Sequence, residues 1–372
     1  MMGMFFVVIL IVLFVARIIK KDSEYSAMEN RVLQGKAELT VDSVMNGQYE
    51  SQTETYISDQ FPLRNAWIRV KTSADILMGK REENGVFLGK SGFLLEDFEN
   101  ADDKKENEKM DALTTFASEH PDMKQYFLLA PTAVNVLDEK LPAFADAGEE
   151  NAYMDQVFSK TQSAGITNID LRETFEKADK ESLYYKTDHH WTTAGAYLAF
   201  QNSCSALGIT ANYPYEPYLI SNTFNGSLAS KSGMRTTKKE NIYAYLPDDT
   251  CPESLVVYPE EDDAKRNSFY HMDKLEEKDK YTIFFGGNHS LMKIETPTED
   301  NKKILVLKDS YANCFLPFLA PYYRHIIVVD PRYYDGNLQT LIDEEQVQEI
   351  LYLYSANTFS LDTSLAGILS QG

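Results

Sequence analysis

The segment KKILVLKDSYANCFLPFLAPYYRHIIVVD (302–330) contains two short apolar runs, ILVL and IIVV, on either side of a helix-like stretch. Continuous apolar runs rich in β-branched residues are typical of strands that are buried on both faces. We expect one helix over 311–323, shortened by Pro317. The alternation continues with a predicted helix over 338–348 and a predicted strand over 349–356.

The same alternation precedes this segment. We predict strands over 124–131 and 166–171, with a helix over 153–165 between them. A further helix is expected over 192–207, with Thr192 as its N-cap. Repeated strand–helix–strand units predict an α/β fold, in which a doubly wound, mostly parallel sheet carries helices on both faces.

The regular pattern is interrupted between residues 212 and 300, where tyrosine, proline and aspartate are frequent. We expect an inserted, irregular and partly β excursion there, without a clear helix, that covers one end of the sheet. The stretch NGVFLGKSGFLLED (84–97) predicts a hairpin. The α/β domain as a whole is placed at 81–372.

The first nineteen residues are apolar except for Arg17, and Lys20 and Lys21 follow. This pattern predicts an uncleaved signal anchor or transmembrane helix over 1–21, because no small-residue cleavage site follows it. The alternative is a buried core helix. Taken alone, positive charge after the segment favours a cytoplasmic location for the rest of the chain. Residues 22–80 are expected to form a juxtamembrane helical region.

Composition excludes several classes of function. The net charge of −21 argues against nucleic acid as a partner and against adsorption to an anionic membrane surface, because phosphates would be repelled. The three cysteines form neither a disulfide framework nor a zinc-binding CxxC pair. We expect neither a metal nor an organic cofactor, and we interpret Cys314 as a small core residue.

Polar residues follow three of the predicted strands. In open α/β sheets, functional side chains collect at the carboxyl ends of the strands. The three sets at these ends are Asp188, His189 and His190; Lys308, Asp309 and Ser310; and Asp330 and Arg332.

Ser310 lies where a buried strand turns into a helix, so its hydroxyl is exposed beside free backbone N–H groups. A serine needs a base to lose its proton at neutral pH, and an imidazole needs a carboxylate to fix its tautomer. Asp188 and His190 can supply both, because the carboxylate of an Asp-x-His turn reaches the ring two positions on. Spacing alone also allows Ser310 to be a helix N-cap and the histidine stretch to be a polar turn.

Other residues are candidates for binding a substrate or an oxyanion. The backbone N–H of Ser310 or of Tyr311 and the amide of Asn288 are possible oxyanion donors, although Asn288 also fits a hairpin turn. Arg332 can pair with a neighbouring aspartate or contact an anionic substrate. We call Asp188, His190 and Ser310 together the relay. We expect His189 to point away from the relay, as a structural or substrate-facing group. Trp191 is interpreted as a packing residue that fixes the histidine loop.

Several stretches together resemble a known family: NGVFLGKSGFLL (84–95), LLAPTAVNVLDEKLP (128–142), YYKTDHHWTTAGAYLAF (184–200), FNGSLASKSG (224–233) and ILVLKDSYANCFLPFLAPYY (304–323). They resemble the DHHW protein family, which is similar to the SGNH-hydrolase-like domains of alginate O-acetyltransferase proteins. The resemblance covers nearly the whole chain after the predicted anchor. It implies a serine-dependent acyl-transfer or esterase domain outside the membrane.

The resemblance also implies a catalytic triad. In the alginate relatives, Asp-x-His-Trp is followed later in the chain by Gly-Thr-Ser-Tyr. Asp188, His190 and Trp191 match the first motif, whereas Ser310 and Tyr311 match the second. The triad implied is therefore aspartate, histidine and serine, in that order along the chain.

Lys308 and Asp309 depart from the second motif, because they stand where the relatives have glycine and threonine. A lysine so close to the serine is a further candidate to assist an oxyanion. The alternative is that the change marks an inactive site.

The expected function is that of a membrane-anchored, extracytoplasmic O-acyltransferase or acylesterase that transfers acetyl groups on a cell-envelope polysaccharide. By analogy, a membrane-bound O-acyltransferase would be the partner that supplies the acyl group. Two alternatives stay open. One is a non-catalytic, polysaccharide-binding envelope protein with the same fold, in which Tyr213, Tyr215 and Tyr218 stack on sugar rings. The other is a metal-dependent phosphoesterase of the DHH type, whose motif is also Asp-His-His.

Overall fold

The computed structural model describes residues 2–26, 31–100, 102–234, 239–260, 263–299 and 301–371. Contacts divide the chain into two compact units, one of residues 1–86 with 227–237 and the other of residues 87–226 with 238–372. Residues 27–30, which belong to the predicted juxtamembrane region, lie outside the described residues.

The larger unit is built on an eight-stranded sheet. Five neighbouring strands of this sheet are parallel, and three antiparallel strands extend it at one edge. In sheet order, the strands are β11 (Ala264–Arg266), β10 (Leu255–Tyr258), β12 (Leu291–Glu295), β14 (His325–Val329), β13 (Lys303–Lys308), β15 (Glu349–Ser355), β6 (Lys124–Ala130) and β7 (Thr167–Asp170).

The central strands form because their apolar runs are buried on both faces. All seven residues of β15 are buried, as are five of the six residues of β13. The neighbouring strand β6 comes from a distant part of the chain, and Tyr352 donates a hydrogen bond to Gln125 across 227 positions. The predicted mostly parallel sheet is confirmed.

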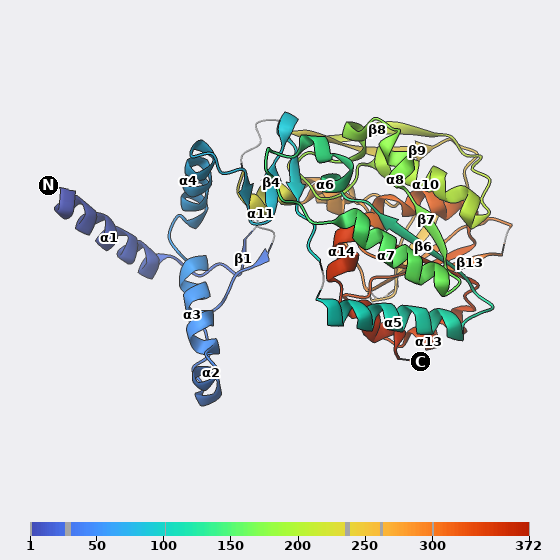
Figure 1. Cartoon of the computed structure of the whole chain (residues 1–372), viewed down its shortest axis with the longest axis horizontal. Coiled ribbons are helices and arrows are strands. Elements are labelled where there is room, and N and C mark those ends of the chain that lie inside the picture. The colour runs from blue at the N-terminus through green and yellow to red at the C-terminus, as the bar shows by residue number, and fades with distance from the viewer. Residues whose placement is uncertain are drawn as a thin grey trace. The chain divides into compact units, whose positions relative to one another are not determined.

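Helices lie on both faces of the sheet. Figure 1 shows α5, α7 and α14 on one side of β6 and β7, with α10 on the other. The helix α10 begins after Thr192, whose hydroxyl accepts a hydrogen bond from the Gly195 N–H, and it ends at Gly208 with φ of +64°. The main helices of this unit are α5 (Asp103–Glu119), α7 (Glu150–Ser163), α10 (Thr193–Leu207), α13 (Leu338–Glu345), α14 (Ala356–Leu361) and α15 (Ser364–Leu369).

The single helix expected over 311–323 is wrong. Three short pieces replace it, the 3₁₀ helices η5 (Ser310–Cys314) and η6 (Ala320–Tyr322) and the α-helix α12 (Leu316–Leu319). Pro317 and Pro321 have no backbone N–H to donate, so they interrupt a continuous helical ladder. The consequence is a tight turn immediately after β13.

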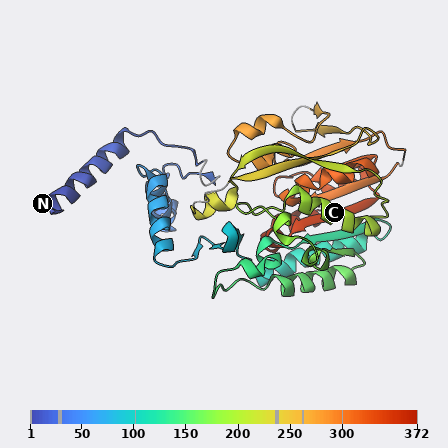
Figure 2. The same cartoon turned by 90° about the horizontal axis from the view of Figure 1, so that it is seen from above.

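The excursion over 212–300 differs in part from its prediction. A two-stranded antiparallel sheet of β8 (Tyr215–Phe224) and β9 (Glu240–Pro247) is present, as Figure 2 shows, but β10 and β12 join the main sheet instead of only covering one end. Alternate residues of β12, Met292 and Ile294, are buried, which explains why this strand pairs there. A short helix, α11 (Ser227–Ser232), also occurs where no helix was expected.

The smaller unit consists mainly of helices. Its elements are α1 (Met2–Ile19), β1 (Tyr25–Ser26), β2 (Arg31–Val32), α2 (Val41–Met45), α3 (Gln48–Asp59), α4 (Arg64–Leu77), β3 (Glu82–Glu83) and α11.

The predicted hairpin over 84–97 appears as β4 (Val86–Leu88) and β5 (Leu94–Glu96), which are sheet neighbours. Among the described residues, no helix has both the length and the apolar character required to cross a membrane. The anchor over 1–21 stays a prediction.

Candidate active site

The histidine loop lies between two points of the backbone that pair with each other. Tyr184 and Trp191 form an isolated antiparallel bridge at the two ends of the loop, and α10 starts two residues later. Inside the loop, the His190 backbone N–H donates to Asp188 Oδ1 at 3.0 Å. This turn places the aspartate carboxylate beside the imidazole two positions on, as the spacing predicts.

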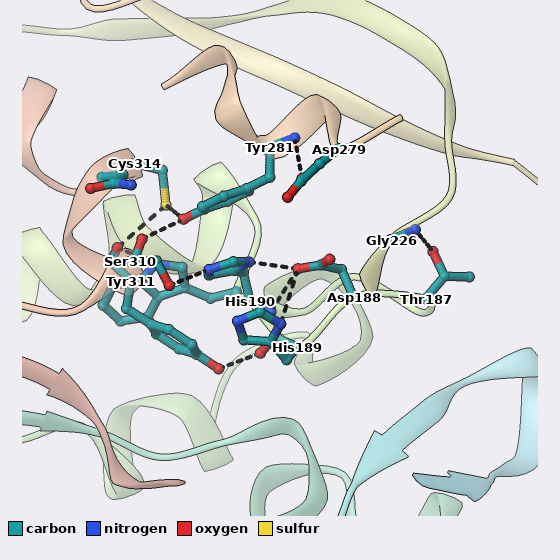
Figure 3. Close-up of polar contacts among 12 residues, drawn as sticks. Thr187, Asp188, His189, His190, Gly226, Asp279, Tyr281, Ser310, Tyr311 and Cys314 are labelled. Carbon is teal, nitrogen blue, oxygen red and sulfur yellow. Dashed lines mark hydrogen bonds and ion pairs between the residues drawn. The ribbon is translucent and has the colours of Figure 1, made fainter. Parts of the chain in front are cut away.

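The imidazole of His190 lies between the carboxylate and the serine hydroxyl. His190 Nδ1 is 2.6 Å from Asp188 Oδ1, and His190 Nε2 is 2.7 Å from Ser310 Oγ. Figure 3 shows these three side chains in line. The structure therefore brings together the acid, the base and the hydroxyl that a serine-dependent acyl transfer requires. Their catalytic roles stay predictions.

The environment of His190 keeps its ring uncharged at neutral pH. The ring is buried and stacks on Tyr281 with centroids 3.7 Å apart and planes 9° apart. Burial, followed by the neighbouring charge of His189, lowers the pKa of His190 to about 4, although Asp188 acts in the opposite direction. A neutral ring hydrogen-bonded to Asp188 through Nδ1 leaves Nε2 as the proton acceptor that faces Ser310.

The position of Ser310 follows from the end of β13 and the start of η5. The Asp309 carboxylate is buried and accepts hydrogen bonds from the backbone N–H and the hydroxyl of Ser355, each at 2.9 Å. The other oxygen of Asp309 accepts from the Tyr311 N–H at 2.8 Å. Asp309 therefore fixes the backbone on both sides of Ser310, which is itself only half-buried and open to a substrate.

This arrangement removes one of the expected oxyanion donors, the Tyr311 N–H, and leaves the other two. The Tyr311 N–H is already occupied by Asp309, so it is not available to a substrate. The Ser310 N–H has no acceptor among the described residues. The Asn288 side chain is exposed, and its Nδ2 group likewise has no acceptor within the described part of the chain. These two N–H donors are the candidates that the geometry leaves.

Lys308 is not an oxyanion donor, contrary to that candidate role. Its ammonium group donates to Asn288 Oδ1 at 3.0 Å and to Asn313 Oδ1 at 2.9 Å, and it lies 3.4 Å from Asp330 Oδ2. Three acceptors therefore account for its three N–H bonds. Arg332 pairs with the same Asp330 carboxylate at 2.6 and 2.8 Å, which favours the pairing role for this arginine.

The remaining candidates connect the two loops. Trp191 is fully buried, and its Nε1 donates to the Tyr311 carbonyl at 3.0 Å. The Tyr311 hydroxyl donates to the His189 carbonyl. The expectation that His189 points away is wrong, because its ring lies 3.9 Å from the His190 ring between centroids. The half-exposed imidazole lies against the relay instead.

The sequence over residues 86–329 matches the DHHW protein family. This range covers more than half of the 372-residue chain. The chain belongs to the DHHW family.

Known proteins similar to this DHHW protein include a probable alginate O-acetylase AlgJ of Pseudomonas syringae pv. tomato. The two are 24% identical over 227 residues, which cover 59% of this chain and 56% of the relative. A second AlgJ, of Pseudomonas aeruginosa, is 22% identical over 59% of this chain and 55% of its own length. The chain thus spans about half the length of these curated relatives.

Two solved structures share the fold. A DHHW family protein from Eubacterium siraeum superposes with a TM-score of 0.64 at 20% identity, over 77% of this chain and 95% of that one. Bacillus cereus PatB1, solved with a sulfonyl adduct, superposes with a TM-score of 0.58 at 22% identity, over 75% of this chain and 98% of that one. At this identity, the likeness supports the fold.

Several residues that surround the relay of this DHHW protein were missed from the sequence. Glu240 of β9 accepts hydrogen bonds from the backbone N–H groups of Lys186 and Thr187 and from the Thr187 hydroxyl. A Cβ on Gly226 would lie 2.3 Å from Asp188 Cβ, so only glycine fits there. Gly226 is the glycine of the FNGS stretch (224–227) that carries part of the family resemblance, but no pattern marks Glu240.

Tyr281 was also missed, and it supports both halves of the site. Its ring stacks on His190, while its hydroxyl donates to the Ser310 carbonyl and to Cys314 Sγ, each at 3.2 Å. Cys314 is buried, as its interpretation as a core residue requires, and burial raises the pKa of its thiol to about 12. A thiol of this kind is no nucleophile at neutral pH.

The same loop could offer ligands to a metal ion. Asp188, His189 and His190 each place one ligand atom within 4.8 Å of the others. Both ring nitrogens of His190 already face partners, Asp188 and Ser310, so coordination through His190 would break the relay. A metal and the serine relay are therefore alternative uses of this loop.

The three tyrosines that could stack on sugar rings differ in how much of each side chain is exposed. Tyr215 is half-buried against Phe318, and Tyr213 lies 5.5 Å from Tyr322 between ring centroids. Tyr218 is 62% exposed. Of the three, Tyr218 has the greatest surface open to a ligand.

Proposed function

We propose that this chain is a serine-dependent O-acyltransferase or acylesterase, with acetyl as the acyl group and a cell-envelope polysaccharide as the substrate. The observation that carries the proposal is the 2.7 Å separation of His190 Nε2 and Ser310 Oγ, with Asp188 at 2.6 Å on the far side of the ring. A histidine so held acts as a general base toward a hydroxyl.

In the proposed mechanism, His190 Nε2 takes the Ser310 proton as Oγ attacks the carbonyl carbon of an acyl ester. The carbonyl oxygen becomes an oxyanion, which the Ser310 N–H and the Asn288 amide stabilise. Collapse of this intermediate breaks the bond to the donor alcohol, which leaves with the proton from His190. The acyl group remains on Ser310 Oγ. A sugar hydroxyl or water then gives its proton to His190 and attacks the acyl carbon. The bond between the acyl carbon and Ser310 Oγ breaks, and Oγ takes the proton back from His190.

Two similarities support this proposal. The curated relatives carry the name of probable alginate O-acetylases, which suggests acyl transfer to a polysaccharide. PatB1, which shares the fold, was solved with a sulfonyl adduct. Electrophilic sulfonyl reagents report activated nucleophiles, so this chain is expected to react with the same class of reagent.

Location is part of the proposal. The helix α1 is apolar, and residues such as Phe5, Ile11 and Phe14 are more than half exposed. We propose that it anchors the protein in the membrane, with the catalytic unit on the extracytoplasmic side. An acyl donor would then come from a membrane-bound O-acyltransferase, because acyl groups must be carried across the membrane to reach that side.

The test is the hydrolysis of p-nitrophenyl acetate by the purified full-length chain. Ser310→Ala should abolish p-nitrophenol release, whereas Ser118→Ala, an exposed serine on α5, should leave it unchanged. A sulfonyl fluoride should add one label per chain, located on Ser310 by mass spectrometry. Equal turnover by Ser310→Ala and the parent would reject the proposal. Glycan binding without any ester turnover would instead support the non-catalytic alternative.

A further inference from the structure

Lys308 is a buried cation two residues before the candidate nucleophile. Its side chain has no exposed surface, and burial lowers the pKa of its ammonium group. Burying a charge is unfavourable unless good contacts compensate for it. Here the contacts are the carboxylate of Asp330 and the side-chain oxygens of Asn288 and Asn313. The lysine therefore organises two amides as well as forming an ion pair.

The two amides are oriented in one way only. Asn288 Oδ1 accepts from Lys308 Nζ and also from Asn313 Nδ2, each at 3.0 Å. An ammonium group cannot accept a hydrogen bond, so the oxygen of each amide must face it. Asn313 Nδ2 is used by Asn288 and by the Gly287 carbonyl at 3.5 Å. The Asn288 NH₂ group, which is directed away from the ammonium group, therefore remains available to donate to a substrate.

Sheet topology places Asn288 near the carboxyl ends of β13 and β14, where Ser310 also lies. The strand β12 runs antiparallel to β14, and Leu291 at its start pairs with Val329 at the end of β14. The strand β13 is parallel to β14, so its carboxyl end lies on the same side of the sheet as the end of β14. Asn313 in η5, three residues after Ser310, contacts Asn288 directly. The amide of Asn288 therefore belongs to the surroundings of the nucleophile.

A cation on an amide oxygen also strengthens the amide as a donor. Hydrogen bonds in a chain polarise one another, and the first donor of this chain, the Lys308 ammonium group, is buried. The positive charge of Lys308 on Oδ1 withdraws electrons from the Asn288 amide and makes its N–H bonds more acidic. A donor that is both oriented and polarised in advance stabilises an oxyanion without reorganising during the reaction.

We propose that Lys308 is a positioning residue that orients and polarises the Asn288 amide toward the oxyanion formed at Ser310. The inference rests on the proposed acyl-transfer function. It assigns a role to the lysine that replaces the glycine of the related motif. Lys308 does not touch the substrate and acts through Asn288.

The test is a double-mutant cycle on the full-length chain, with p-nitrophenyl acetate as the substrate. Lys308→Met and Asn288→Ala should each lower kcat roughly 10- to 100-fold, with KM changed less than about threefold, because the interaction is made in the transition state. The double variant should be no slower than the slower single variant, because both changes remove one function. Multiplicative losses in the double variant would overturn the inference.

A matched control separates positioning from stability. Lys109 is another buried lysine, and it contacts Glu106 and the carbonyl groups of Phe359 and Ser360 away from the relay. Lys109→Met should lower the melting temperature while leaving kcat per folded molecule unchanged. If Lys308→Met does not fold, Asn313→Asp provides a second variant, because it keeps an acceptor for Lys308 but removes the donor to Asn288. Its loss of kcat should likewise vanish in the Asn288→Ala background, and an independent loss would contradict the inference.

Failure of the proposed function can be told apart from failure of this inference. If the parent shows no turnover that depends on Ser310, the proposed function is wrong. A crystal structure of Lys308→Met, or of Asn313→Asp if the first does not fold, then decides the inference. The Asn288 amide should rotate away from its position in the parent, and an unchanged amide would overturn the positioning role.

Discussion

Ser310 lies 120 positions after His190 in the chain, yet its hydroxyl is 2.7 Å from His190 Nε2. The next residues along each loop are tied as well, since Trp191 Nε1 donates to the Tyr311 carbonyl at 3.0 Å. The indole hydrogen bond is buried, whereas the serine is only half-buried. Two successive residues on one loop therefore hold two successive residues on the other, and the buried pair supports the reactive pair.

Replacing Asp188 by asparagine should lower kcat by about 10²- to 10⁴-fold, because the carboxylate fixes the tautomer of His190 and stabilises the imidazolium that forms. Esterase assays check this, with circular dichroism as a control for folding. The exposed control Asp248→Asn, on a turn of the excursion, should retain full activity. Equal activity of Asp188→Asn and the parent would show that the carboxylate has no part in the reaction.

The pH dependence of kcat/KM should reveal the buried state of His190. Its pKa is lowered to about 4, so the neutral ring that accepts the serine proton persists well below pH 6. As pH falls through about 4, the ring gains a proton and activity is lost tenfold per pH unit. The measurement is a pH–rate profile, restricted to conditions in which circular dichroism shows a folded chain. An acidic limb centred near pH 6.5 would show that the ring is not desolvated.

Gly226→Ala should damage the site without touching the relay chemically. The new methyl group would lie 2.3 Å from Asp188 Cβ and 2.5 Å from Oδ2, so the aspartate must move. We expect a loss of about 1–3 kcal/mol in the free energy of unfolding, with a large fall in kcat. Gly367→Ala is the control, because its Cβ would meet open space within α15. Normal activity of Gly226→Ala would mean that the loop can shift freely.

Glu240→Gln should weaken the loop that carries Asp188. The carboxylate accepts from two backbone N–H groups and one hydroxyl, whereas a glutamine amide would present a donor to some of them. Unfolding by urea should show a loss of about 1–3 kcal/mol. Glu216→Gln, exposed on the neighbouring strand β8, should change neither stability nor activity. A stable Glu240→Gln variant with normal turnover would exclude this contribution.

Chelators should leave esterase activity unchanged, because both nitrogens of His190 are used by the relay. The check is turnover after treatment with EDTA, followed by addition of Mn²⁺. A parallel assay tests the DHH-type alternative by measuring phosphodiester hydrolysis by the same chain in the presence of Mn²⁺. Activity that needs Mn²⁺ and survives Ser310→Ala would favour metal-dependent chemistry by Asp188, His189 and His190.

The parts of the fold that local pattern determines could be predicted from the sequence. Apolar runs marked β13, β14 and β15, and Thr192 marked the start of α10. The pairing of β10 and β12 with the main sheet could not be predicted, because short strands in a tyrosine-rich segment carry little periodicity. The helices α14 and α15 after the last strand also went unrecognised.

In the candidate site, too, local contacts could be predicted from the sequence and long-range contacts could not. Asp188 and His190 are two residues apart, so a local turn was enough to predict their contact. The contact with Ser310 needed the family resemblance, because spacing says nothing about residues 120 positions apart. Lys308 was named as an oxyanion candidate, but its three partners come from different elements. Such a network becomes visible only when the chain is folded.

The position of β15 beside β6 has a consequence for synthesis of the protein. While the ribosome makes the chain, β6 emerges long before β15, its partner on one side, so that edge stays open. Pairings between such distant segments form slowly, and their precursors are prone to aggregation. Nascent chains should therefore depend on chaperones until the C-terminal strand is complete, and labelling of the serine should appear only in the last phase of refolding.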